Sequence, residues 1–239
     1  GFKKPFDEVL GRAMRETMKY LCENIQGCVL GYTQSDEITL LLTDYDTLTT
    51  DAFFDYRVQK MCSITASMAT LKFNQYFRTA CNEFFAGKTI DDDIGDYHTT
   101  MMQTKDKGAM FDSRCFNIPK EEVVNCFIWR QQDATRNAIQ MLGQTYFTHK
   151  ELHKKTCNDI QDMLMLQKGI NFNDMPAEFK RGICCRKVDA YKPKIAGDRD
   201  SGIDWNTKRQ VWYLDKEIPI FTQDRDYIQQ YVDEQCKEI

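Results

Sequence analysis

The sequence predicts an α+β fold, because helical and strand-like segments follow one another in the order helix, strand, strand, helix, strand, helix. One more strand before Gly1 would make this a ferredoxin-like β-α-β-β-α-β unit, so we expect its first strand to be missing from this chain. The length of 239 residues and the hydrophobic content of 42% suit one such domain with an appendage.

Hydrophobic periodicity in the first half of the chain supplies these segments. Apolar residues recur at helical spacing after Pro5, and two short apolar runs bounded by polar residues predict paired strands. Pro119 ends another apolar stretch and begins a helix. The polar stretch 82–107 contains Gly95, so we expect a loop or a lid there. The predicted elements are helices over 6–24, 50–77 and 119–142 and strands over 27–33, 37–43 and 111–118.

The second half predicts a C-terminal appendage of helices and a hairpin. A change of composition near 148–155 favours a boundary there, with one domain over 1–147 and a second over 148–239. The predicted elements of the second domain are helices over 156–168, 176–181 and 223–236 and hairpin strands over 182–188 and 210–215, joined by a polar loop over 194–207.

Composition limits the class of protein. No apolar run approaches the roughly 20 residues that cross a bilayer, so we expect no membrane contact. Ten cysteines at irregular spacings favour free thiols in a reducing cytoplasm over a disulfide scaffold or a zinc cluster. The formal net charge of −4 argues against a general polyanion binder.

Two adjacent carboxylates, Asp36 and Glu37, lie in the turn between the first two predicted strands. At a hairpin tip they can hold a divalent metal against nucleotide phosphates, and an ordinary exposed turn is the alternative. Arg57 and Lys60 are one turn apart on the next predicted helix. Such cations suit phosphate oxygens or, equally, surface ion pairs.

Polar side chains also gather on two later segments. A helix from Pro119 would place Arg130, Asp133 and Asn137 along one stripe, which is rich in hydrogen-bonding groups for a solvated face. The stretch 178–194 carries six basic and two acidic residues, so it would support contact with a folded nucleic acid. On charge alone, a solvated surface is the simpler interpretation of this stretch.

Taken together, these segments resemble the tRNA-His guanylyltransferases and their bacterial and archaeal relatives, the Thg1-like proteins. The resemblance covers about residues 1–187. Its most specific segments are Gln34-Ser35-Asp36-Glu37 and Trp129-Arg130-Gln131-Gln132-Asp133. The other matching segments are Lys4-Pro5-x-Asp7, Arg57-x-x-Lys60 with Ser63, Phe111-Asp112-x-Arg114, Asn137, Gly169-Ile170-Asn171-Phe172-Asn173 and Phe179-Lys180-x-Gly182.

The resemblance implies a polymerase-like palm and a nucleotidyltransferase that extends the 5′ end of tRNA in the 3′-to-5′ direction. ATP would activate a 5′-monophosphate, or a 5′-triphosphate would be used directly. The 3′-hydroxyl of an incoming nucleotide such as GTP then attacks, with two Mg²⁺ ions as cofactors. The family also implies a homo-oligomer, commonly a tetramer. The C-terminal appendage would support tRNA binding and oligomerisation.

The same resemblance assigns roles to individual residues. Asp36 would be a catalytic metal ligand, and Glu37 a metal ligand or its close support. The implied nucleotide-binding residues are Lys4, Asp7, Ser35, Arg57, Lys60 and Ser63. The implied contacts to tRNA or phosphate are Arg130, Asn137, Lys180, Arg181, Arg186 and Lys187.

The chain departs from the family pattern in two places. The Asp-Gly motif with the family's other metal-binding aspartate is absent, and we expect it upstream of Gly1. Thr135 replaces the histidine that follows Trp-Arg-Gln-Gln-Asp in eukaryotic members, which favours the Thg1-like branch that repairs 5′-truncated tRNAs. A palm-type nucleotide cyclase and a non-catalytic tRNA-binding protein remain alternatives.

Overall fold

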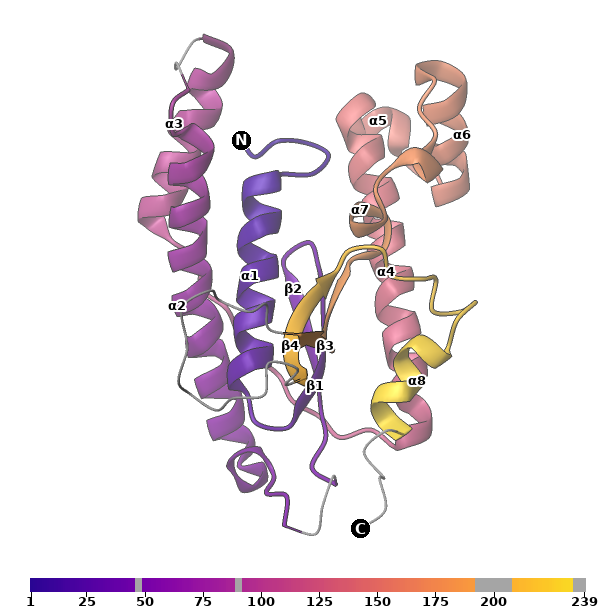
Figure 1. The fold of residues 1–239 in the computed structure, drawn as a ribbon. Coiled ribbons are helices and arrows are strands. Elements are labelled where there is room, and N and C mark those ends of the chain that lie inside the picture. Colours follow the sequence, from indigo (N-terminus) through magenta and orange to yellow (C-terminus); the bar gives the residue numbers. More distant parts are fainter. Residues whose placement is uncertain (46–48, 89–91, 192–207, 234–239) are drawn as a thin grey trace.

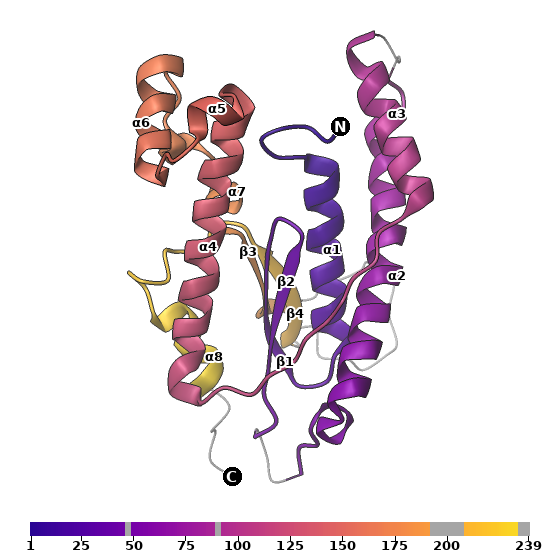
Figure 2. The same ribbon diagram turned by 180° about the vertical axis from the view of Figure 1, so that it is seen from behind.

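A four-stranded antiparallel sheet lies between two groups of helices. The computed structural model describes residues 1–45, 49–88, 92–191 and 208–233. The strand order is β2-β1-β3-β4. Helices α1, α2 and α3 lie on one side of the sheet, and α4 and α8 lie on the other (Figure 1, and Figure 2 from behind). The predicted combination of helices with an antiparallel sheet is therefore confirmed.

The elements have the following bounds. The helices are α1 Glu8–Asn24, η1 Phe53–Tyr56, α2 Val58–Phe85, α3 Asp92–Lys107, α4 Lys120–Tyr146, α5 His149–Leu152, α6 Cys157–Lys168, η2 Phe172–Asp174, α7 Ala177–Arg181 and α8 Asp226–Asp233. The strands are β1 Cys28–Gln34, β2 Glu37–Leu42, β3 Ile183–Tyr191 and β4 Lys208–Asp215. None of these helices is both long and apolar enough to cross a membrane.

β1 and the first residues of β3, Ile183 to Cys185, are buried on both faces because each face is covered by helices. Leu30 and Tyr32 of β1 pack with Phe127 of α4 and with Cys184 of β3. Cys185, the next residue of β3, points to the opposite face and packs in the cluster that includes residues of α1. This alternation follows the two-residue period of a strand, and it positions the β1–β2 hairpin between α1 and α4.

The predicted first helix, the first hairpin and the helix after Pro119 are confirmed by α1, β1 with β2, and α4. The second helix begins later than predicted, at Val58. Phe54, Asp55 and Tyr56 before it have φ angles of 51°, 50° and 57°, which a right-handed helix does not allow. It also continues beyond Phe77, because Ala80 and Cys81 remain buried against α1 and α3.

The prediction of a loop or lid over 82–107 is wrong for most of its length, because residues 92–107 form α3. Tyr97 and Met101 are four residues apart and pack with Phe77 of α2 in one buried cluster. Two large side chains at helical spacing are enough to dock a short polar helix on a long one. The polar majority of the segment concealed this pair.

The prediction of a strand over 111–118 is also wrong, because these residues form no strand and pair with none of the strands that the structure describes. The chain is held at the start of this segment by side chains of α2. Asn74 Oδ1 accepts from the Ala109 N–H at 2.8 Å, and Asn74 Nδ2 donates to the Ala109 carbonyl at 2.9 Å. Thr70 Oγ1 accepts from the Phe111 N–H at 3.0 Å. The alternating hydrophobicity of 111–118 therefore belongs to an extended segment that is held against α2, and not to a strand of the sheet.

The second predicted hairpin exists, but it is not an appendage. β3 and β4 pair with each other, and β3 also pairs with β1 from Leu30–Arg186 to Thr33–Ile183. The apolar run Ile183-Cys184-Cys185 suits a central strand that is buried on both faces. One sheet thus contains strands from both sides of the boundary predicted at 147–148. The loop predicted over 194–207 lies outside the described residues, as do the last residues of the helix predicted over 223–236.

The predicted helices over 156–168 and 176–181 are confirmed by α6 and α7. A capping box of Thr156 and Asp159 begins α6, and Gly169 ends it with φ 67°. Ile160 and Leu164 of α6 pack with Leu142 of α4. α4 continues beyond the end of the sheet, and α6 lies beside that part of it (Figure 1).

Candidate carboxylate tip and its surroundings

The acidic pair lies at the tip of the β1–β2 hairpin. β1 and β2 pair as far as Gln34 and Glu37, so Ser35 and Asp36 form a two-residue turn. Ser35 has φ 51°, which the first position of such a turn requires in several turn types. Ser35, Asp36 and Glu37 are all exposed. We name these three residues the carboxylate tip.

The structure brings Arg130 of α4 to the carboxylate tip. Arg130 Nη1 donates to Glu37 Oε2 at 3.2 Å, and Gln34 Nε2 lies 3.5 Å from the same oxygen. The Arg130 guanidinium also lies 5.3 Å from the ring centroid of the exposed Trp129. The Asp36 carboxylate has no hydrogen bond or ion pair to any residue that the structure describes. Asp36 is therefore the free carboxylate of the pair.

The predicted polar stripe on α4 continues from Arg130 through Asp133 to Asn137. Asn137 Nδ2 donates to Asp133 Oδ2 at 3.1 Å, and Arg136 pairs with the other oxygen of Asp133. The neighbouring Gln131 is buried and was not predicted from the sequence. Its amide donates to the Pro219 carbonyl at 2.9 Å and accepts from the Phe221 N–H at 2.8 Å. A polar residue at a helical position between apolar neighbours was the available signal.

Lys4 and Asp7 lie at the start of α1, and the Asp7 carboxylate already accepts hydrogen bonds from other residues of the chain. Its two carboxylate oxygens accept from the Leu10 N–H at 3.0 Å and from the Lys3 N–H at 2.9 Å. The Tyr97 hydroxyl donates to Asp7 at 2.9 Å, and burial together with this bond raises the pKa of Tyr97. Asp7 thus serves as the N-cap of α1. Lys4 is exposed.

Arg57, Lys60 and Ser63 are not brought to the carboxylate tip. Phe53, just before α2, packs with Cys28 and Leu42, which are at the opposite end of the hairpin. Six residues of strand at about 3.3 Å each separate the two ends by roughly 20 Å. At that end Arg57 pairs with Asp55 at 3.5 Å, and the Lys60 ammonium lies 4.6 Å from the Phe54 ring centroid. The expected cluster of two cations beside two carboxylates is therefore wrong for a single chain.

The basic residues of the C-terminal half are divided between two places. Lys180 and Arg181 line a cavity of about 300 Å³ together with Gln132 and Thr135 of α4 and Asn173. Arg186 and Lys187 lie on β3. Arg186 donates to Asp215 of β4 at 3.1 Å, and Lys187 lies over the Trp212 ring at 5.3 Å. Residues 192–194 of the predicted basic stretch lie outside the described residues.

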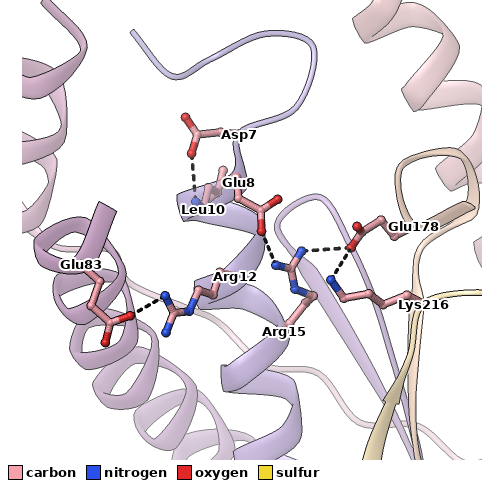
Figure 3. Close-up of polar contacts among 8 residues, drawn as sticks. All are labelled: Asp7, Glu8, Leu10, Arg12, Arg15, Glu83, Glu178 and Lys216. Atoms are coloured by element: carbon pink, nitrogen blue, oxygen red, sulfur yellow. Dashed lines mark hydrogen bonds and ion pairs between the residues drawn. The ribbon is translucent and has the colours of Figure 1, made fainter. Parts of the chain in front are cut away.

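A buried ion network that the sequence did not indicate ties α1 to α7. Arg15 contacts Glu8 at 2.8 Å and Glu178 at 3.0 Å, and Lys216 lies 3.6 Å from Glu178 (Figure 3). The helical periodicity of α1 places position 15 on the buried side, beside Met14. A charged residue at such a position was the only signal for this network.

The carboxylate tip has the donor chemistry for a hard divalent cation. Carboxylate oxygens suit Mg²⁺, which usually binds one or two carboxylates and keeps water and phosphate oxygens as its other ligands. The described residues contain no group of three His, Cys, Asp or Glu side chains that could hold a metal alone. An ion at the tip would therefore depend on Asp36, on Glu37 and on ligands from outside these residues.

Comparison with known proteins finds similarity to one protein family along almost the whole chain. A family model described as tRNAHis guanylyltransferase matches residues 1–119. The structure of a bacterial tRNA(His) guanylyltransferase (Thg1)-like protein in complex with ATP is 41% identical, with a TM-score of 0.76, and the match covers 97% of this chain and 83% of that chain. Another such structure, in complex with GTP, is 38% identical with a TM-score of 0.72 and covers 98% of this chain and 82% of that chain.

A viral relative is longer than the chain. Protein R259 of Acanthamoeba polyphaga mimivirus is 28% identical over 199 residues, which make up 78% of this chain. The match covers 64% of the viral protein, so the chain spans less than two thirds of that relative.

Proposed function

Because the chain belongs to the family of tRNAHis guanylyltransferases and Thg1-like proteins, we propose that it adds nucleotides to the 5′ end of tRNA. ATP would activate the 5′ phosphate, and the 3′-hydroxyl of an incoming nucleotide such as GTP would attack it, which extends the chain in the 3′-to-5′ direction. The sheet and its carboxylate tip would act as a polymerase-like palm. Thr135, in place of the family histidine, favours repair of truncated tRNAs.

The observation that carries this proposal is the exposed carboxylate tip with Asp36 free. A carboxylate without a partner at the end of a rigid hairpin can bind a metal–nucleotide complex without first breaking an internal contact. Bound there, Mg²⁺ would polarise the phosphoryl group and favour deprotonation of the attacking hydroxyl. A second ion needs a further carboxylate, which we expect upstream of Gly1. Asp36 and Glu37 would orient the nucleotide through the ions that they hold.

The residues proposed for nucleotide binding form two groups. Lys4 precedes Phe6, whose ring stacks on the ring of Phe179 of α7, with 4.4 Å between the ring centroids. This contact supports the proposal that Lys4 and Ser35 contact the nucleotide at the end of the sheet that carries the carboxylate tip. Asp7 would act by holding the start of α1. Arg57, Lys60 and Ser63, at the other end of the hairpin, would bind the triphosphate of a nucleotide held at that end, and not of one held at the tip of the same chain.

The tRNA would lie along α4 and the segments that follow it. Arg130 and Asn137 continue the surface from the carboxylate tip, and Lys180 and Arg181 line the cavity next to that stripe. Arginine and lysine at these positions would bind phosphates of the RNA backbone, with Arg186 and Lys187 of β3 farther along. We also propose a cytoplasmic location. We further propose a homotetramer, and light scattering on the purified protein would test this oligomeric state.

The direct test uses the full-length protein, a 5′-truncated tRNA, ATP, labelled GTP and Mg²⁺. We expect a labelled, longer tRNA and a loss of roughly 100-fold or more in Asp36→Ala. The melting temperature of this variant should not change, because residue 36 is exposed. Glu83→Ala is the matched control, since Glu83 is an acidic surface residue of α2 whose side chain is 54% exposed.

Other outcomes would point to the other two classes. A cyclic product from labelled GTP without tRNA would identify a nucleotide cyclase. Salt-sensitive tRNA binding with no product at any Mg²⁺ concentration would identify a non-catalytic tRNA-binding protein. Full activity in Asp36→Ala would remove Asp36 from the metal site.

A further inference from the structure

The carboxylate tip has one polar contact from outside its own hairpin among the described residues, and this contact comes from Arg130. The Nη1 to Oε2 distance is 3.2 Å across 93 residues of sequence. The side chains of Arg130 and Glu37 are 31% and 50% exposed. Water and solutes can therefore reach both partners, so the pair can form and separate without unfolding.

The two partners differ in how firmly they are held. α4 is fixed on both sides of Arg130, because Phe127 packs against Tyr32 and Gln131 is hydrogen-bonded to the segment that carries Phe221. Among the described residues β2 pairs with β1 alone, and Glu37 is its exposed first residue, next to the turn. The guanidinium is thus presented by a rigid helix to a carboxylate at the exposed end of a hairpin.

The charges around the tip are unequal before any ligand binds. Asp36 and Glu37 place two negative charges on adjacent residues, and Arg130 pairs with one of them. A divalent ion that binds both carboxylates competes with the guanidinium for Glu37, because the same oxygen cannot serve both at full strength.

We propose that Arg130 has two successive roles in the proposed reaction: it positions Glu37 before a divalent ion binds, and it contacts the nucleotide phosphate afterwards. Arg130 holds Glu37 while the carboxylate tip carries no divalent ion, and an ion that binds the tip displaces it. The released guanidinium then lies beside the tip on a rigid helix, where it donates to a phosphate oxygen of the nucleotide. This inference rests on the proposed function, because it takes the tip as the metal site.

Binding of Mn²⁺ to the full-length protein without nucleotide, measured from the electron paramagnetic resonance signal of the free ion, tests the competition. Arg130→Met should bind Mn²⁺ about 2- to 5-fold more tightly than the unmodified protein, which is the range for losing a partly exposed ion pair. Arg12→Met is the matched control, since Arg12 pairs with Glu83 on the exposed surface between α1 and α2 (Figure 3). Its Mn²⁺ affinity should not change.

Binding of ATP in the presence of Mn²⁺ tests the second half of the proposal. Arg130→Met should bind ATP roughly 10-fold more weakly, because one charged hydrogen bond is lost, and Arg130→Lys should recover most of the affinity. A purely structural role for Arg130 would not tighten Mn²⁺ binding while it weakens ATP binding. Melting temperatures establish that each variant is folded.

Two results would overturn the inference. One is Mn²⁺ binding by Arg130→Met that is unchanged or weaker, and the other is ATP binding that does not depend on residue 130. Asp36→Asn separates this failure from a failure of the proposed function. If Asp36→Asn binds Mn²⁺ as well as the unmodified protein, the tip is not the metal site. If Asp36→Asn loses Mn²⁺ and Arg130→Met does not gain it, only the role of Arg130 is wrong.

Discussion

Arg15 Nη1 on α1 donates to Glu178 Oε2 on α7 at 3.0 Å, although 163 residues separate the two in the chain. The Arg15 side chain is 8% exposed and that of Glu178 is 15% exposed. A guanidinium that leaves water needs partners for its donors, and Glu8 supplies another at 2.8 Å (Figure 3). The pair fixes α7, and therefore the start of β3, against the first half of the chain.

Loss of this buried cation should destabilise the protein strongly. Arg15→Met leaves the Glu178 carboxylate in place with only Lys216 nearby, at 3.6 Å. We expect the free energy of unfolding to fall by about 3 kcal/mol, as for other broken buried pairs. Arg12→Met removes an exposed pair and should cost no more than about 1 kcal/mol. Urea denaturation measures both, and equal losses would show that burial of Arg15 contributes nothing.

Asp7 should be important for stability even when no nucleotide is present. Its carboxylate caps α1 and accepts from the Tyr97 hydroxyl at 2.9 Å, so it joins α1 to α3. Asp7→Ala should lower the free energy of unfolding by about 2 kcal/mol, because it removes the N-cap of α1 together with the acceptor for Tyr97. Tyr97→Phe keeps the cap and should cost about 1 kcal/mol. If Asp7→Ala melts at the normal temperature and only loses nucleotide affinity, Asp7 is a nucleotide contact and not a structural cap.

Any side chain at Gly31 should destabilise the protein, because the Cys22 sulfur occupies the space that a Cβ atom would need. A Cβ atom at Gly31 would lie 2.5 Å from the Cys22 Sγ and 3.0 Å from the Met18 Cγ, both on α1. Gly31→Ala would push α1 away from the sheet, and we expect a loss of about 1 to 3 kcal/mol in the free energy of unfolding. Cys22→Ala removes the sulfur, so the double variant should lose less than the sum of the single losses. Strictly additive losses would show that the two positions do not compete for space.

Sequence patterns predicted the fold where burial follows a simple period. α1 and α4 each bury one regular stripe, and β1 and β2 are short apolar runs bounded by polar residues, so both patterns predicted these elements directly. α3 was missed because only Tyr97 and Met101 of its described residues are buried, within a mostly polar segment. The partner of β3 could not be predicted, since pairing with β1 depends on the three-dimensional path of residues 43–182. Local patterns say that a strand exists, but not which edge it joins.

In the candidate site, too, the features encoded by neighbouring residues were predicted, and the contacts between distant segments were not. Asp36 and Glu37 were predicted at a turn because the turn is encoded within a few residues. The contact from Arg130 depends on how α4 packs across the sheet, so the stripe was predicted and its partner was not. Asp7 lies inside the helix predicted over 6–24, so its role as the N-cap of α1 was not predicted. The grouping of Arg57 and Lys60 with the tip failed because helix spacing says nothing of where a helix begins in space.

Asn74 should hold the segment that resembles a strand but pairs with none. Its side-chain amide makes both hydrogen bonds to the backbone of Ala109, at 2.8 and 2.9 Å. Asn74→Leu should therefore speed hydrogen exchange of the Ala109 amide and cost about 2 kcal/mol in the free energy of unfolding. Thr70→Val is the matched control, because the Thr70 side-chain oxygen accepts from the Phe111 N–H and makes no bond to Ala109. It should expose the Phe111 amide and leave the Ala109 amide protected. Continued protection of Ala109 in Asn74→Leu would mean that another group holds this segment.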